Sequence, residues 1–479
     1  MSASVPMPLA VPDRRPVGVE LTRQASALTP ARQTFRSIWF SLLLGAICFE
    51  GLGRRYLPGI PSGVFYFSKD LILLVGLLRF RINRDVAKTC AALYGRFLPF
   101  LKLAIFWTFA ELINPDQRSL LLGLLGLRAY WFWWLAPLVV ASVLLDPVVR
   151  RKMIILQAAV TMVVAGLAIL QFGAPVNDPL NTYSVVDGQE SLAFAVETTG
   201  RARVSSTFSF ISGFADFAVL VPVLLLSIGL GEKDRKARLA SLIAVLLAAA
   251  ALPMSGSRGP FLTSLALCSI VVWRAGLIFT RVGRRVVLLA VAAGFTTVYA
   301  FPEALQGVFD RLEGEDTPDR AAEFLTVLPP VALMRYGSTP LGIGTGMMQN
   351  YRQQLGVQDE VEPVEAELAR YMVELGSAGF LLVWAAKLGL AVALWRASKV
   401  LKKARRPAAS ACAAVYALLG IYGNLVFDHI YSALFFVGVG FILQEVVQAR
   451  LGAVRRPKED KRLVDAPQVA PVMVMEPSP

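Results

Sequence analysis

Residues 239–273 read "LASLIAVLLAAAALPMSGSRGPFLTSLALCSIVVW". Two apolar runs flank a short turn of glycine and serine that holds Arg258. Long apolar runs of this kind are typical of transmembrane helices. Because a lipid-exposed backbone must satisfy its own hydrogen bonds, we expect two helices that cross a membrane, with Arg258 where the chain turns back.

Similar runs recur along the whole chain and define its class. Hydrophobic residues make up 56% of the 479 positions, whereas soluble domains contain about 45–50%. The runs do not alternate apolar and polar residues as the strands of a membrane barrel do. We therefore predict an all-α polytopic membrane protein with about 12 transmembrane helices. The predicted helices cover residues 37–53, 60–78, 98–114, 129–147, 153–172, 208–230, 239–254, 260–279, 286–302, 368–395, 408–427 and 430–448.

One further apolar segment, "LLLGLLGL" (120–127), is too short to cross a membrane by itself. We expect it to form a re-entrant or packed half-helix.

The distribution of lysine and arginine tests this threading independently. Basic residues gather in the N-terminal tail, in the alternate connections near 79–96, 150–152, 233–238, 281–285 and 396–406, and in the C-terminal tail. By the positive-inside rule, these segments and both termini face the cytoplasm. We predict a disordered cytoplasmic tail over 1–35, a transmembrane domain over 36–449 and a disordered basic cytoplasmic tail over 450–479. The long connection 303–367, between predicted helices 9 and 10, is then a large periplasmic loop.

The same distribution limits the partners. The formal net charge of +14 is explained by the cytoplasmic loops, so we predict no nucleic-acid partner. The four cysteines fall in apolar runs or basic loops, which does not suggest a disulfide framework. With one histidine and no cysteine cluster, we expect no metal and no cofactor.

Four arginines on the predicted outer side are candidate phosphate-binding residues, because the guanidinium fork fits phosphate oxygens. They are Arg201 and Arg203 in "GRARVSSTFSF" (200–210), Arg258, and Arg370 near the start of predicted helix 10. Ser205, Ser206 and Thr207 add hydroxyl groups at the start of a helix, where backbone N–H groups attract anions. The alternative is structural: the arginines pair with lipid phosphates or Glu197, and the hydroxyls cap the helix.

Three residues are candidates for a general base, which needs reach and a suitable pKa. Glu365 and Glu367 lie in "PVEAELARYMVELGSAGF" (363–380), and His429 follows Asp428 between predicted helices 11 and 12. The structural alternatives are a capped, self-paired helix start and a histidine without a catalytic role. Ionisable residues inside predicted helices are also functional candidates, and they include Lys69, Asp70, Lys102, Glu111, Asp216 and Lys387.

The order of four short motifs resembles the O-antigen ligase / O-antigen polymerase family. Arg203 is followed by Ser-Ser-Thr-Phe before a predicted helix, and Ser-Arg-Gly (257–259) ends the next hairpin. A Pro-x-Gly-x-Gly turn (340–344) and a Glu-Leu-Gly-x-x-Gly run (374–379) follow in the long loop and predicted helix 10. The resemblance covers roughly residues 150–450 and implies an enzyme of the bacterial inner membrane whose active face is periplasmic.

The resemblance further implies a metal-independent inverting glycosyltransferase. Its donor would be a glycan on undecaprenyl diphosphate, and its acceptor a hydroxyl of another glycan or of lipid A-core, reached within the membrane lipid. Arg203 and Arg258 would bind the diphosphate. The family's usual His-Asn pair falls near 365–366, where this chain has Glu-Ala. The base is therefore Glu365, Glu367 or His429, and the activity is that of a ligase or of an O-antigen or exopolysaccharide polymerase.

Two other classes of function stay open. A 12-span transporter or flippase of an envelope polysaccharide precursor fits the helix count, although the chain shows no internal repeat and its polar clusters lie at one face. A non-catalytic partner in polysaccharide assembly fits the missing family histidine.

Overall fold

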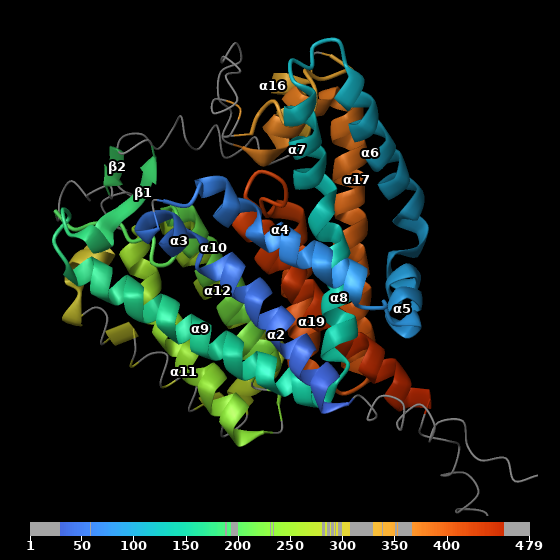
Figure 1. The fold of residues 1–479 in the computed structure, drawn as a ribbon. Helices are drawn as coiled ribbons and strands as arrows, with labels where there is room; N and C mark the ends of the chain where they lie inside the picture. The colour runs from blue at the N-terminus through green and yellow to red at the C-terminus, as the bar shows by residue number, and fades with distance from the viewer. Residues whose placement is uncertain are drawn as a thin grey trace, which may run out of the picture.

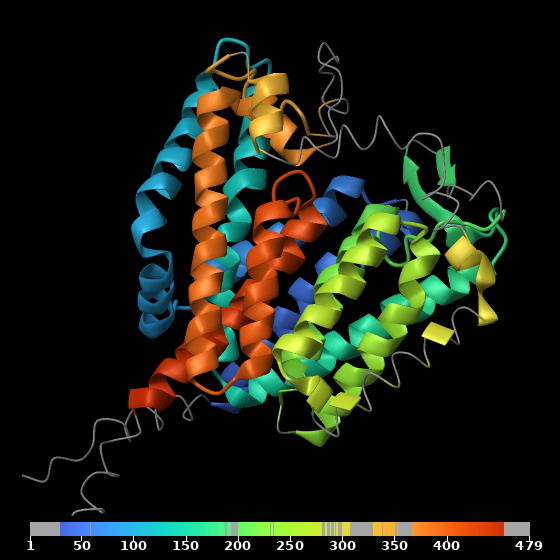
Figure 2. The same cartoon turned by 180° about the vertical axis from the view of Figure 1, so that it is seen from behind.

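The computed structural model describes residues 29–306, 329–349, 352 and 366–454, apart from gaps at 58, 187–188, 193–199, 230, 233 and 338 and at several positions between 280 and 298. The described chain is a helical bundle (Figures 1 and 2). Most of both predicted tails lies outside the described residues. Where they overlap, the structure is helical, because α2 begins at Pro30 and α19 continues to Val454.

Most of the described helices follow the apolar runs, but Arg84–Tyr94 lies in a predicted basic connection and Pro329–Tyr336 lies in the predicted long loop. In chain order they are α2 (Pro30–Cys48), α3 (Glu50–Tyr56), α4 (Ser62–Arg79), α5 (Arg84–Tyr94), α6 (Leu98–Ala110), α7 (Leu120–Trp131), α8 (Ala136–Leu144), α9 (Pro147–Gly173), α10 (Ile211–Leu224), α11 (Arg235–Ala251), α12 (Arg258–Arg274), α16 (Pro329–Tyr336), α17 (Glu367–Lys403), α18 (Pro407–Tyr422) and α19 (His429–Val454). The strands β1 (Thr182–Val186) and β2 (Gln189–Leu192) form one antiparallel hairpin.

Six helical stretches of the described chain are long and apolar enough to cross a membrane. They are Leu120–Leu144, Pro147–Gly173, Ile211–Gly229, Arg235–Ser255, Glu367–Lys403 and His429–Gly452, and α2 with α3 adds a seventh if this pair, bent by 63°, counts as one span. The class of a helical, multi-pass membrane protein is thus confirmed. The count of 12 spans stays a prediction.

The segment 120–127 is not a separate half-helix. It begins the continuous stretch Leu120–Leu144, which is 25 residues long, so that expectation was wrong. Arg128 interrupts the apolar run in the sequence. In the structure its guanidinium is ion-paired with Asp70 and donates a hydrogen bond to Tyr66 Oη over 3.2 Å, which allows the helix to continue through this position.

One end of the bundle gathers the basic connections. Gln33 Nε2 donates to Asp146 Oδ2 over 2.9 Å, which brings the start of α2 to the α8–α9 connection. Arg150 binds Glu445 of α19 over 2.7 Å. The same guanidinium is ion-paired with Glu232 in the α10–α11 connection. Arg406 in the α17–α18 connection is also ion-paired with Glu445. These segments lie together at the lower end of the molecule in Figure 1, and their assignment to the cytoplasm stays a prediction.

The opposite end carries β1, β2, α3, α16 and the start of α17 (Figures 1 and 2). Between the two ends, α19 is buried on all sides along its apolar stretch, and α10 nearly so. A helix that is apolar all round is typical of the interior of a membrane bundle. Helices α8 and α17 pack against α19, and α12 packs against α10.

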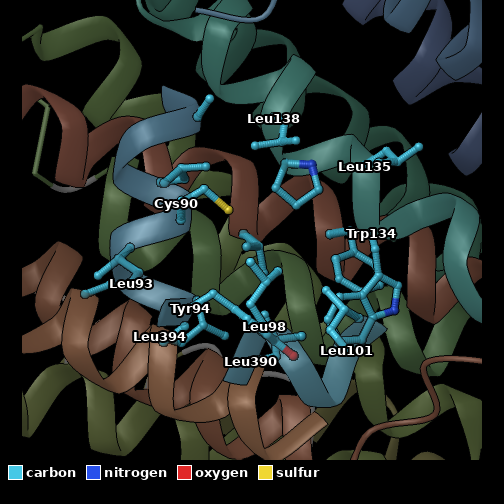
Figure 3. A pocket seen from close by; sticks show the side chains of 18 of the residues that line it. Cys90, Leu93, Tyr94, Leu98, Leu101, Trp134, Leu135, Leu138, Leu390 and Leu394 are labelled. Carbon is cyan, nitrogen blue, oxygen red and sulfur yellow. The ribbon is translucent and has the colours of Figure 1, made fainter. Parts of the chain in front are cut away.

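A cavity of about 520 Å³ lies among α5, α6, α8, α17 and α19. Side chains such as Cys90, Leu98, Trp134, Leu138 and Leu390 surround it in Figure 3, and its lining is almost wholly apolar. The polar end of Tyr94 is occupied, because its hydroxyl donates to the carbonyl of Ala386 over 2.7 Å. This cavity is therefore separate from the charged residues that the sequence singles out.

Candidate functional site

Two of the arginine motifs meet at the upper end of the bundle. Arg203 Nε donates to the carbonyl of Ser255 over 3.2 Å, and its Nη2 donates to Ser257 Oγ over 3.1 Å. Ser257 immediately precedes Arg258, the first residue of α12. Gly256, between Ser255 and Ser257, has φ +60°, a backbone conformation that favours glycine. The turn thus brings two half-buried arginines to the N-terminus of one helix.

Arg201 lies at the edge of this group. Its Nη1 donates to the carbonyl of Gly173, the last residue of α9, over 3.4 Å. The contact links the arginine segment to the end of a spanning helix. Along the chain, Arg201 is two residues before Arg203.

The hydroxyls of "SST" (205–207) do not face an anion site, contrary to our expectation. All three residues are buried. Arg55 Nη2 donates to Ser205 Oγ over 2.9 Å, and Ser206 Oγ donates to the carbonyl of Val164 over 2.6 Å. The hydroxyls do not cap a helix either, because α10 begins only at Ile211. The hydroxyls of Ser205 and Ser206 fix the path of the segment that carries Arg203.

Ser206 adopts a left-handed backbone conformation with φ 53°, which is rare outside glycine. Its N–H donates to Gln171 Oε1 over 2.7 Å, and its carbonyl accepts from Arg55 Nη1 over 3.4 Å. Strained residues persist where their surroundings over-determine them, often at functional sites. The segment before α10 is therefore held rigidly.

Helix α3 makes contacts that we did not expect from the sequence. Arg54 Nη1 donates to Ser209 Oγ over 3.2 Å, and Arg55 binds the carbonyls of Leu180, Ser206 and Phe208. A signal was present, because "GRRY" (53–56) places two arginines in an outer connection that is otherwise poor in basic residues. Gly51 of the same helix packs directly on the backbone of Phe208.

His429 lies beside the first residue of α3. Its Nε2 is 3.0 Å from Glu50 Oε1, and Glu50 Oε2 accepts from Lys69 Nζ over 2.5 Å. The side chains of Glu50 and Lys69 are almost fully buried, whereas that of His429 is 28% exposed. The Tyr66 ring packs on the imidazole at 4.6 Å. A buried carboxylate thus orients an accessible imidazole.

Asp428 immediately precedes α19, next to this histidine. Its Oδ1 accepts hydrogen bonds from the backbone N–H groups of Ile430 and Tyr431 over 2.9 and 3.0 Å. The carboxyl of Asp216 in α10 lies near enough to interact with it electrostatically. The contact joins α10 to the 423–428 connection.

Glu367 and Arg370 lie on the other side of the same connection. Glu367 Oε1 accepts from the backbone N–H of Leu425 over 3.0 Å and from the Tyr371 hydroxyl, and Oε2 accepts from Lys387 Nζ over 3.2 Å. Both carboxylate oxygens are thus occupied. The Arg370 guanidinium lies 5.1 Å from the centre of the Phe427 ring. Glu365, the third candidate base, lies outside the described residues.

The glycine motifs of the long loop and of α17 belong to one structural unit. The helix breaks at Gly376, which has φ 67° and ψ 179°. The backbone N–H groups of Ile343 and Gly344 donate to the carbonyls of residues 373 and 374 over 3.0 and 3.1 Å. In return, the N–H groups of Ser377 and Ala378 donate to those of residues 339 and 340. The loop therefore satisfies the backbone groups that the break sets free.

Glu374 holds this unit in place. Its side chain is buried, with Oε1 accepting from the Met348 N–H over 2.6 Å and Oε2 from the Tyr130 hydroxyl over 2.9 Å. Glu111 has a related role, because its Oε1 accepts from the N–H of Gly342 over 3.2 Å. These acids therefore position the loop and do not face a substrate.

The upper end thus has two parts that α3 connects. Arg203 and Arg258 lie on one side, and His429 with the 423–428 connection and Arg370 on the other. Arg55 of α3 contacts the arginine segment, while Glu50 of the same helix contacts His429. The arrangement offers cations for an anionic group and one oriented imidazole for proton transfer.

The comparisons with known proteins add no family assignment. The sequence matches no family model, and no curated protein matches it significantly.

Proposed function

We propose that this protein transfers a glycan from a polyprenyl-diphosphate donor to a hydroxyl acceptor at the upper end of the bundle. The observation that carries the proposal is the double contact of α3. Its Arg55 binds the segment that presents Arg203, and its Glu50 binds His429. A cationic group and a candidate base thus share one rigid support.

In this proposal, Arg203 and Arg258 bind the diphosphate. Two guanidinium groups and the N-terminus of α12 provide fixed positive charge, which stabilises the negative charge that develops as the leaving group departs. Arg201 extends the same surface. A donor with a lipid tail explains why such a site lies at the end of membrane-spanning helices.

His429 is the base that the contacts favour. With Nε2–H donating to Glu50, Nδ1 is the atom that accepts the proton of the acceptor hydroxyl. The acceptor oxygen then bonds to the anomeric carbon while the bond from that carbon to the diphosphate oxygen breaks, which inverts the configuration. Glu367 is less suitable, because both of its oxygens already accept hydrogen bonds.

The test is a gene deletion in the source bacterium, complemented with variants and read out as surface glycan. His429→Gln is expected to lower transfer by about 10²–10⁴-fold, the usual contribution of a general base. Arg203→Ala and Arg258→Ala are expected to abolish transfer at a normal membrane level, whereas Arg151→Ala at the other end serves as the control. Full activity of both arginine variants would refute the proposal that Arg203 and Arg258 bind the diphosphate.

The same experiment separates the two transferase reactions. If the deletion strain lacks glycan on lipid A-core, the protein is a ligase. If its glycans contain only a single repeat unit, the protein is a polymerase. Full activity of His429→Gln would transfer the role of base to Glu365 or Glu367.

A carrier of the lipid-linked precursor is the second candidate. It is favoured by the buried ion pairs Lys69–Glu50 and Lys387–Glu367, because ionisable groups within membrane helices often mark a transport path. Movement of the donor across proteoliposomes that contain no acceptor would support the carrier. A transferase would instead form product without net movement of the donor.

A further inference from the structure

A second cluster of arginines lies at the lower end of the bundle, away from the residues discussed above. An open cavity of about 510 Å³ is lined by Arg32 and Arg36 of α2, by Arg79 at the end of α4 and by Arg81 just after it. Phe35 and Phe80 form its aromatic wall, with ring centres 5.7 Å apart. Four basic side chains thus converge on one hollow between two helices.

Among the described residues, no carboxylate is in direct contact with these guanidinium groups. Within the part of the chain that the structure describes, none of the four guanidinium groups takes part in a hydrogen bond or a salt bridge. Arg79 stacks over Phe35 at 5.6 Å, and Arg36 interacts electrostatically with Asp146. The Asp146 carboxylate, however, already accepts from the N–H groups that begin α9 and from Gln33.

Apolar side chains continue from this hollow along both helices. On α2, Phe35, Ile38 and Leu42 are exposed at helical spacings of three and four residues. On α4, the exposed side chains of Leu71, Leu74, Val75 and Leu78 lead to Arg79. The basic hollow therefore forms one end of an exposed apolar surface.

We propose that this hollow binds the phosphate headgroup of an anionic membrane lipid, whose acyl chains lie along α2 and α4. Basic pockets between membrane helices are suited to anionic headgroups, since each arginine near the surface adds electrostatic attraction. Arginine forks match the phosphate oxygens. The positive-inside rule alone explains why arginines lie at this end. It does not explain why four of them surround one cavity in which no described carboxylate is hydrogen-bonded to them.

The test uses the full-length protein in a zwitterionic detergent, with phosphatidylglycerol as the anionic lipid and phosphatidylcholine as the neutral lipid. Native mass spectrometry measures the apparent dissociation constant of the first bound lipid. We expect phosphatidylglycerol to bind more tightly than phosphatidylcholine. We expect the double variant Arg32→Gln/Arg81→Gln to weaken phosphatidylglycerol roughly thirtyfold, from the usual contribution of two interfacial basic residues.

Arg84→Gln is the matched control, because Arg84 is exposed nearby but does not line the cavity. It is expected to bind the lipid like the wild type. Melting in phosphatidylcholine, unchanged in all variants, verifies the fold. If the double variant does not fold, the two single variants are used, each with an expected loss of about fivefold.

Three results would overturn the proposal. They are equal affinity for the two lipids, equal loss in Arg84→Gln and in the double variant, and displacement of the lipid by inorganic phosphate alone. The last result would mean that the hollow binds a free anion. Because the hollow is at the opposite end from His429, the outcome is independent of the proposed transferase activity.

Discussion

Replacement of Gly376 by alanine tests the central structural claim about the long loop, that its glycine motif pairs with a break in α17. The residue has φ 67° and ψ 179°, a conformation almost confined to glycine. A Cβ atom there would also overlap the backbone of residues 340 and 341. The substitution therefore either strains the break or restores a regular helix and releases the loop.

The expected cost follows from these two routes. Backbone strain in this region costs about 1–3 kcal/mol, and four backbone hydrogen bonds join the loop to the break, each with a net contribution of about 1 kcal/mol. We expect Gly376→Ala to lower the free energy of unfolding by about 1–4 kcal/mol, the range that the two routes span. At an unfolding entropy of about 2.1 cal/mol/K per residue, this corresponds to a melting temperature lower by roughly 1–4 °C.

Melting and limited proteolysis provide the assay. Gly166→Ala is the control, because Gly166 lies within α9 and a Cβ atom there would meet no neighbouring atom within 4 Å. Alanine at that position should be neutral or slightly stabilising. Faster cleavage within 339–349 is expected only in Gly376→Ala. If both variants melted and resisted protease like the wild type, the pairing of loop and helix would be refuted.

Two further predictions concern buried polar contacts. Glu374→Gln should lower the free energy of unfolding by about 1–3 kcal/mol in a melting assay. The amide N–H₂ of the new glutamine would face either the Met348 N–H or the Tyr130 hydroxyl, and one donor would be left unsatisfied. An unchanged melting temperature would contradict this prediction. Arg150→Ala should cost about 2 kcal/mol, since it removes the link between Glu445 and the α10–α11 connection while Arg406 keeps one partner for Glu445. The adjacent Arg151→Ala should have no measurable effect, because that side chain is 51% exposed, and equal losses in the two variants would refute the distinction.

Local sequence determined where most helices lie and which connections share an end. In lipid, each backbone segment must satisfy its own hydrogen bonds, so a long apolar run has few alternatives to a helix. The basic connections predicted on one side do meet, as the contacts of Arg150 and Arg406 with Glu445 show. The segment 120–127 was misjudged because the partner of Arg128, Asp70, is 58 residues away in the chain.

Tertiary structure decided which polar residues meet. His429 and Glu50 are 379 positions apart, and no local pattern pairs them. The role of α3, the burial of Ser205–Thr207 and the occupied oxygens of Glu367 likewise depend on which helices pack together. Helix formation is enforced residue by residue through backbone hydrogen bonding, whereas the partner of a buried charge depends on how the whole bundle packs.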